Sequence, residues 1–157
     1  MADSILVIGF GNPLRQDDGV GQHVARMVAA LKWPCVQAIA VHQLTPELAE
    51  SLAAASKAVF VDAAPGTEAV RRCPILENTH ANVMAHTGDA TWLLGLAGSV
   101  FGKRPPAWLV TIPSHQMEYG FGLSPMAKRG AREAVAMIDE LRHQSEIDAQ
   151  REQRSRR

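Results

Sequence analysis

Short, uninterrupted runs of apolar residues alternate along this chain with segments in which apolar residues recur every three or four positions. Uninterrupted runs are typical of parallel strands covered on both faces, and the longer spacing is typical of helices with one buried face. The pattern predicts strands at residues 5–9, 36–41, 58–61, 70–76 and 107–112. Strands that alternate with helices imply right-handed crossovers. We therefore expect a single doubly wound α/β domain, with a roughly five-stranded, mostly parallel twisted sheet and helices on both faces.

The starts of two expected helices carry capping signals. Thr45-Pro46 and Ser124-Pro125 each place an N-cap residue before a proline that would stand at the first helical position. Another helix should begin near Val20, and a further one at about Asp89 or Ala90. The buried face of that further helix would be formed by Trp92, Leu93, Leu96, Ala97 and Val100.

Residues 70–76 are expected to form an edge strand, because Pro74 cannot donate a hydrogen bond to a strand ladder. The segment that follows, residues 77–90, is polar and loop-like. Cys35 stands directly before one expected strand and Cys73 lies inside another, and no CxxC spacing is present. We therefore expect both thiols to be buried and unreactive.

The composition limits the class of protein. At 157 residues and 46% hydrophobic content, one domain with a substantial core is expected. The 16 basic residues balance 16 acidic ones, which argues against binding nucleic acid or a membrane surface by charge. No apolar run approaches the roughly 18 residues of a membrane span, and we expect no signal peptide. These features predict a cytoplasmic protein.

The expected domain covers residues 1–145, followed by a charged tail at residues 146–157. The tail reads EIDAQREQRSRR and contains one large aliphatic residue, Ile147, and no aromatic residue. Such a segment offers little apolar surface for packing. We expect it to be flexible, as a helical overhang or a disordered end.

The loop after the first strand differs from a nucleotide-binding loop. Residues 5–21 read ILVIGFGNPLRQDDGVG. A dinucleotide-binding fingerprint would place its third glycine where Leu14 stands, and Pro13 has no backbone donor for a phosphate. Asp17 and Asp18 would repel a pyrophosphate, whereas a helix N-terminus stabilises a single carboxylate. We therefore interpret this loop as one that presents a carboxylate.

Three acidic or histidine positions fall beyond the carboxyl ends of the expected strands, where open α/β sheets form their sites. Asp18 follows the first strand, Asp62 ends the third, and His86 precedes the helix that begins near Ala90. Each has a structural alternative: a helix cap, a hydrogen-bonded carboxylate and a solvated loop residue, respectively. Spacing does not separate His86 from three other histidines, which are His42, His80 and His115. Two carboxylates and an imidazole suit a divalent transition-metal ion with open coordination positions.

Motifs of other hydrolytic sites are missing from the sequence. GxSxG and HExxH are absent, and neither cysteine stands at the start of an expected helix. The adjacent pair Ser114-His115 is no sign of a catalytic triad, because triads are assembled in space.

Four segments together resemble the hydrogenase maturation endopeptidases. GFGNPLRQDDGVG is similar to that family's Gly-x-Gly-Asn…Asp-Asp/Glu-Gly-x-Gly segment, and VFVDAAPG is similar to its strand that ends in a metal-binding aspartate. AHTGDATWLLGLAG resembles the region in which the family's ligand histidine precedes a helix, and EYGFGLSP resembles a segment near its last helix. The resemblance covers about residues 4–141, and the order and spacing of the segments add to its specificity.

This resemblance implies an activity and a metal site. Family members remove a C-terminal extension from the large-subunit precursor of nickel–iron hydrogenase after nickel insertion. Carried onto this sequence, their metal ligands fall on Asp18, Asp62 and His86, which would also be the catalytic residues. The family often has glutamate as the first ligand, so Asp18 would reach less far by one methylene. Nickel would arrive with the precursor, the expected partner of a monomeric, aspartyl-endopeptidase-like hydrolase.

Two other functions are compatible with the sequence. One is a nickel-binding chaperone of the same fold without catalytic activity. The other is a nucleotide-binding regulatory domain, which Leu14 and the pair Asp17-Asp18 disfavour.

Overall fold

The computed structural model describes residues 3–77 and 85–157, with side chains for all of them except residues 85–88. These residues form a five-stranded sheet with the strand order β2-β1-β3-β5-β4. All neighbouring strands pair in parallel except β4 and β5, which are antiparallel. The strands are β1 (Ile5–Phe10), β2 (Val36–Val41), β3 (Lys57–Pro65), β4 (Arg71–Pro74) and β5 (Ala107–Ser114). The predicted five-stranded, mostly parallel sheet is confirmed.

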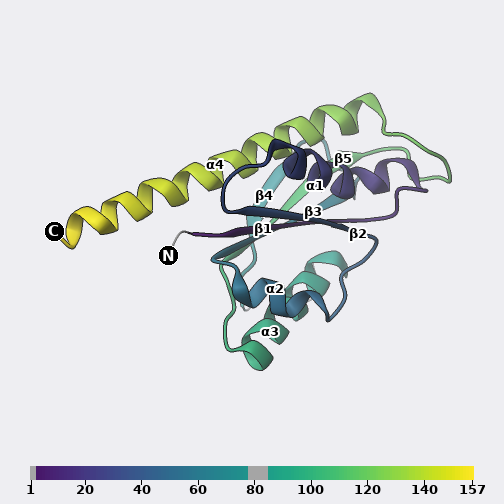
Figure 1. The fold of residues 1–157 in the computed structure, drawn as a ribbon. Coiled ribbons are helices and arrows are strands. Elements are labelled where there is room, and N and C mark those ends of the chain that lie inside the picture. Colours follow the sequence, from purple (N-terminus) through teal and green to yellow (C-terminus); the bar gives the residue numbers. More distant parts are fainter. Residues whose placement is uncertain (1–2, 78–84) are drawn as a thin grey trace.

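Helices cover both faces of the sheet (Figure 1). Two pack on one face, α1 (Val20–Leu31) and α4 (Pro125–Ser155). The other face carries α2 (Leu48–Ala54) and α3 (Ala85–Phe101). One turn of 3-10 helix, η1 (Gln16–Gly19), leads into α1. This arrangement confirms the expected doubly wound α/β architecture.

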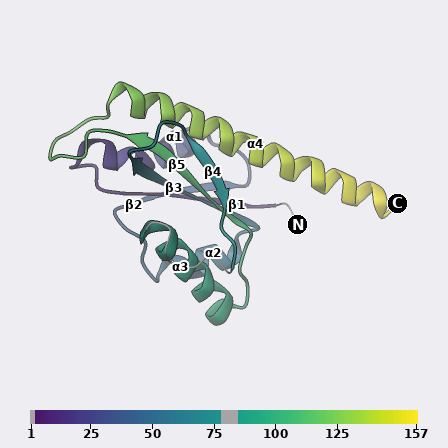
Figure 2. The same ribbon diagram turned by 180° about the vertical axis from the view of Figure 1, so that it is seen from behind.

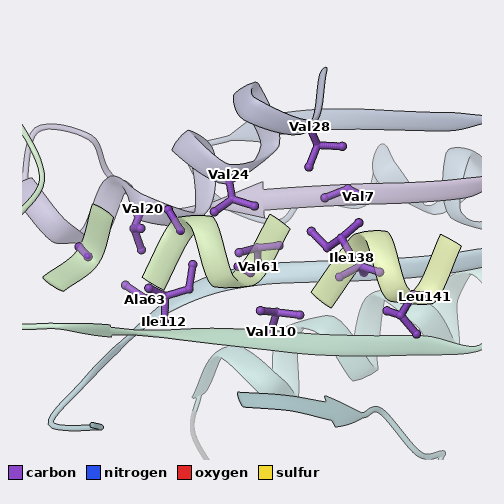
Figure 3. Close-up of a cluster of buried hydrophobic side chains, with 14 of the residues drawn as sticks. Val7, Val20, Val24, Val28, Val61, Ala63, Val110, Ile112, Ile138 and Leu141 are labelled. Atoms are coloured by element: carbon purple, nitrogen blue, oxygen red, sulfur yellow. The ribbon is translucent and has the colours of Figure 1, made fainter. Parts of the chain in front are cut away.

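Two hydrophobic cores lie on the two sides of the sheet. Val7, Val61 and Val110 extend from neighbouring strands towards Val24 of α1 and Ile138 of α4 (Figure 3). The opposite core contains large side chains from the same strands and from α2 and α3, among them Leu6, Phe60, Leu52 and Leu93. Each such side chain stabilises the fold by about 1.5–3 kcal/mol. The double coverage explains why β1 and β3 are uninterrupted apolar runs.

Two further sequence predictions, for β4 and for the start of α4, are confirmed. β4 is an edge strand, as Pro74 predicted, and all four of its residues are exposed. Ser124 caps α4, because its hydroxyl accepts a hydrogen bond from the Ala127 N–H at 3.2 Å. Pro125 occupies the first position of this helix.

The start of α3 differs from the prediction. The helix begins at Ala85, about four residues earlier than expected, so His86 lies inside its first turn. Polar residues are compatible with a first turn, because the N–H groups there lack intrahelical partners. The predicted buried face is wrong at Trp92 and Val100, which are 57% and 62% exposed. Because α3 is apolar on nearly all sides, its periodicity does not identify the buried face, which consists of Ala90, Leu93, Leu94 and Ala97.

The expectation of buried thiols is wrong for both cysteines, which are exposed. Cys35 lies in the turn before β2 and has a positive φ of 60°. Cys73 lies on β4, the edge strand that is open to solvent. Their residue type suggested burial, but their positions at a turn and at an edge determine their exposure.

Helix α4 continues well past the body of the domain (Figures 1 and 2). Leu141 and Ser145 are its last buried residues, and every residue from 150 to 157 is exposed. Residues 146–155, expected to belong to a tail, are therefore helical, while the flexibility of this segment and the domain boundary at 145 stay predictions. Within residues 3–77 and 85–157, no helix is long and apolar enough to cross a membrane.

Candidate active site

A cleft of about 310 Å³ opens beyond the carboxyl ends of β1 and β2. The chain passes from β1 to β2 through α1, whereas β3 pairs with the other side of β1. In open α/β sheets, ligands bind at such a divergence, which here lies between β1 and β3, and the cleft lies beside it over the ends of β1 and β2. Polar and charged groups line much of this cleft, whose lining residues are Phe10, Gly11, Asn12, Arg15, Asp18, His42, Gln43, Leu44 and Asp89. Two larger grooves, of about 430 and 470 Å³, lie by the opposite ends of β1 and β2.

Asp18 reaches this cleft from η1. The Asn12 N–H donates to Asp18 Oδ2 at 2.9 Å, which orients the carboxylate towards the turn after β1. Gly11 has a φ of +138°, and a Cβ there would lie 2.0 Å from the Asp18 carbonyl oxygen. Only glycine therefore allows the turn to close over Asp18, which explains its place in the opening motif.

Asp62 is not among the described residues that line this cleft, and it lies on β3, the strand next to β1. Its side chain is 3% exposed, and its Oδ1 accepts a hydrogen bond from the Ala63 N–H at 2.9 Å. β1 and β3 pair as far as Gly9 and Val61, so Asp62 stands where the two strands separate, at the level of Phe10. The expectation that Asp62 ends its strand is wrong, because β3 continues beside β5 to Pro65.

The elements that carry the two carboxylates are packed together. η1 contacts β3, and the start of α1 rests on the ends of β1 and β3. A Cβ on Gly21 would lie 2.4 Å from the Val61 carbonyl oxygen and 2.5 Å from that of Phe10. Gly21 therefore permits α1 to approach both strands, which brings Asp18 to the end of the sheet where Asp62 lies.

His86 belongs to the first turn of α3, but its side chain lies outside the described residues. Asp89, three residues later, lines the same cleft as Asp18, so the beginning of α3 borders this cleft. Among the side chains that the structure describes, no three His, Cys, Asp or Glu groups lie close enough to hold a metal ion. The predicted ligand set of Asp18, Asp62 and His86 therefore stays a prediction.

The alternative histidines occupy different places. His42 is exposed and lines the cleft beside Asp18. His115 is exposed after β5, and its backbone N–H takes part in a separate interaction described next. His80 lies outside the described residues.

The buried carboxylate of Asp17 has a role that the sequence did not reveal. It accepts four hydrogen bonds from the loop between β5 and α4. The N–H groups of His115 and Gln116 donate to Oδ2 at 3.0 and 3.1 Å. Ser124 donates its N–H to Oδ1 at 2.7 Å and its hydroxyl to Oδ2 at 2.8 Å. Asp17 thus fastens the loop after β1 to the loop after β5.

The same contacts favour the charged form of Asp17. Burial by itself raises the pKa of this carboxyl, but hydrogen bonds from the backbone of Ser124 and His115, the Ser124 hydroxyl and the Gln116 N–H outweigh it. The pKa is held below its usual value. Asp17 is therefore ionised at neutral pH although it is fully buried. Adjacent Asp17 and Asp18 have opposite uses: the first points inward to hold the structure, and the second points towards the cleft.

Arg15 connects the cleft to the loop after β5. It lines the cleft, and its Nε donates to the Met117 carbonyl oxygen at 3.1 Å. Its guanidinium group is the one cationic side chain, apart from His42 when protonated, among those that line the cleft in the described part of the chain. The cleft therefore combines carboxylates with a guanidinium held by the neighbouring loop.

No protein-family model and no curated protein matches this sequence. Solved structures do match it. The [NiFe] hydrogenase maturation protease HybD from Thermococcus kodakarensis is 23% identical with a TM-score of 0.73, over 88% of this chain and 98% of that one. The hydrogenase maturating endopeptidase HybD from E. coli is 22% identical with a TM-score of 0.72, over 90% and 93%.

The chain has the hydrogenase maturation endopeptidase fold. A further match is the [NiFe] hydrogenase maturation protease HycI from Thermococcus kodakarensis KOD1, 22% identical with a TM-score of 0.66, over 87% of this chain and 90% of that one. The fold implied by the four sequence segments is thereby confirmed. The high coverage of both chains means that the hydrogenase maturation endopeptidase fold accounts for most of this chain.

Proposed function

We propose that this protein is an endopeptidase that removes the C-terminal extension of a nickel–iron hydrogenase large-subunit precursor after nickel insertion. The observation that carries this proposal is the placement of Asp18 and Asp62 at the end of the sheet where β1 and β3 separate, within a fold shared with proteins described as hydrogenase maturation proteases. The expected site of action is the cytoplasm, and the expected form is a monomer.

The precursor-bound nickel would be what this site recognises. Asp18, Asp62 and His86 would bind the ion, and the absence of thiolates among them suits moderate affinity for a divalent transition metal. Asn12 holds Asp18 in position, and the strand pairing around Val61 holds Asp62. Ligands fixed in this way are ready to accept an ion that a partner delivers, because little reorganisation is needed on binding.

The peptide bond to be cleaved would lie in the cleft next to the ion. A bound metal ion supplies Lewis acidity to a carbonyl oxygen or to a water molecule. Arg15 lines the cleft and carries a positive charge, so it would stabilise negative charge that develops on the peptide oxygen. The walls formed by Leu44 and Phe10 would limit the access of bulk water.

The deciding experiment is to incubate the purified, metal-free protein with a nickel-loaded precursor and to follow the precursor by mass spectrometry. Loss of a C-terminal fragment is expected, and Asp62→Asn is the matched inactive control. A precursor that binds and stays uncut would instead assign the protein as a nickel-binding chaperone. Saturable binding of NAD or ATP at micromolar concentration would favour a nucleotide-binding regulatory domain, although Asp18 and Asp89 in the cleft oppose phosphate binding.

A further inference from the structure

The loop between β5 and α4 presents two aromatic side chains almost entirely to solvent. Tyr119 is 85% exposed and Phe121 is 86% exposed. The chain has only one tyrosine and four phenylalanines, and Phe10 and Phe60 are buried. Two such exposed aromatic residues within three positions are unexpected in a protein with 5% aromatic content, because large apolar surface is normally removed from water.

A third apolar side chain, Leu14, joins these two from the loop after β1. The Gly120 N–H donates to the Leu14 carbonyl oxygen at 2.9 Å, and the Gln16 N–H donates to the Gly120 carbonyl oxygen at 3.2 Å. Gly120 lies between Tyr119 and Phe121, so the backbone pairing places Leu14 beside the segment that carries both aromatic residues. Leu14 is 49% exposed. We call Leu14, Tyr119 and Phe121 the aromatic rim.

Glycine at position 120 makes this pairing possible. Its φ is +153°, and a Cβ there would lie 2.8 Å from Gln16 Nε2. A larger residue would be strained at this φ and would displace the Gln16 side chain. The two exposed aromatic residues therefore flank a position whose backbone conformation favours glycine.

Hydrogen bonds to Asp17 connect the two loops that carry the aromatic rim. The Asp17 carboxylate binds the backbone at both ends of the loop, at His115 and Gln116 on one side and at Ser124 on the other. A loop whose ends are already held in place loses less backbone entropy when a partner binds. Figures 1 and 2 show both loops at the end of the sheet opposite the chain termini.

The aromatic rim adjoins the cleft through Arg15. This residue lies between Leu14 and Gln16 in the chain, lines the cleft, and donates to the Met117 carbonyl oxygen. The aromatic rim therefore borders the cleft on the side of Arg15, where a folded partner whose peptide segment enters beside Asp18 is expected to lie.

From this juxtaposition we infer that the aromatic rim is the docking surface for the hydrogenase large-subunit precursor, through an apolar patch beside the segment that enters the cleft. The inference rests on the proposed function and adds the mode of recognition. Tyrosine and other aromatic residues dominate the binding energy of protein interfaces when a partner covers them. The aromatic rim supplies the affinity, and the carboxylates of the cleft supply the selection for a metal-loaded partner.

The test compares the wild-type protein with the double variant Tyr119→Ser/Phe121→Ser on the nickel-loaded precursor. The expected result is a KM at least about tenfold higher with an unchanged kcat, which corresponds to loss of binding contacts that do not change during the reaction. The matched control is Leu31→Ser, since Leu31 is 49% exposed like Leu14 but lies at the C-terminal end of α1, before the chain enters β2. Unfolding temperatures of all variants check that the fold is retained.

A binding measurement separates failure of the inference from failure of the proposed function. The immobilised nickel-loaded precursor should bind the wild-type protein and Leu31→Ser equally, and the double variant at least about tenfold more weakly. Equal binding of the double variant would overturn the inference while leaving cleavage to stand. Wild-type binding without cleavage would overturn the proposed function alone. Dimers of the free protein that dissociate in the double variant would overturn the inference by assigning the aromatic rim to a second copy of this chain.

Discussion

The carboxylate of Asp17 accepts hydrogen bonds from both the backbone N–H and the hydroxyl of Ser124, at 2.7 and 2.8 Å, across 107 positions of the chain. Ser124 is also the N-cap of α4. One buried contact therefore joins the loop that carries Asp18, the loop that carries the aromatic rim, and the start of the longest helix. The site depends on this contact although Asp17 does not line the cleft.

We predict that Asp17→Asn will destabilise the protein by at least about 2 kcal/mol, because an amide leaves buried donors without an acceptor and places its own N–H₂ against them. Urea unfolding at neutral pH measures the difference. Asp18→Asn is the matched control, because it changes the neighbouring, half-buried carboxylate, which accepts a backbone hydrogen bond from Asn12. Equal stability of Asp17→Asn and Asp18→Asn would contradict the structural role assigned to Asp17.

We predict that Asp18→Asn, Asp62→Asn and His86→Ala will each abolish processing of the precursor while the circular dichroism spectrum stays unchanged. Loss of a direct ligand should reduce metal affinity or activity by more than the roughly 10–100-fold typical of residues that only support ligands. Mass spectrometry of the precursor gives the readout.

The histidine assignment has its own control. His42→Ala and His80→Ala should remain active, although His42 lines the cleft. An active His86→Ala together with an inactive His42→Ala would transfer the ligand role to His42. Full activity of Asp62→Asn would eliminate the metal site altogether.

We predict that a nickel-free precursor will not be cut, whereas the nickel-loaded one will. Two carboxylates and one imidazole bind a divalent ion only moderately, so the ion must arrive with a partner that holds it more tightly. The shared ion would then increase the affinity between the two proteins only after loading. Equal cleavage of both precursors by the metal-free protein, or activity restored by zinc alone, would identify an ordinary metalloprotease.

Deletion of residues 146–157 should change the unfolding temperature by less than about 2 °C and leave cleavage nearly unchanged. Leu141 and Ser145, the last buried residues of α4, are retained in this variant, and Ile147 is 45% exposed. Thermal unfolding and the cleavage assay are the measurements. A decrease of several degrees would show that the overhang stabilises the domain, and loss of cleavage alone would show that it contacts the precursor.

The parts of the fold that the sequence predicted are those with a local physical cause. The uninterrupted apolar runs of β1 and β3 reflect burial on both faces, Pro74 excludes a central strand, and the hydroxyl of Ser124 caps a helix that begins with proline. Exposure depends instead on what packs against a residue. Trp92 and Cys73 were therefore placed wrongly: one lies on the open side of an almost uniformly apolar helix, and the other on an edge strand.

The candidate site, like the fold, was predictable only in part from the sequence. The rule that sites form beyond the carboxyl ends of parallel strands predicted Asp18 and Asp62. The structure places Asp18 beyond the end of β1, whereas Asp62 lies inside β3, at the level where β1 ends. The role of His86 stays a prediction, since its side chain lies outside the described residues. Asp17 gave no signal of its own, because its partners, from His115 to Ser124, are about a hundred positions away and only the folded sheet brings them close.

The overhang of α4 has a practical consequence for experiments on this protein. A 31-residue helix is about 46 Å long, and the last part of α4 leads away from the domain at the end opposite the cleft (Figure 2). A surface linkage or a fluorescent probe at Arg157 would therefore be separated from the cleft and from the aromatic rim by the whole length of the sheet. The end of α4 therefore acts as a spacer, and attachment at Arg157 should leave the cleft and the aromatic rim open to a large partner.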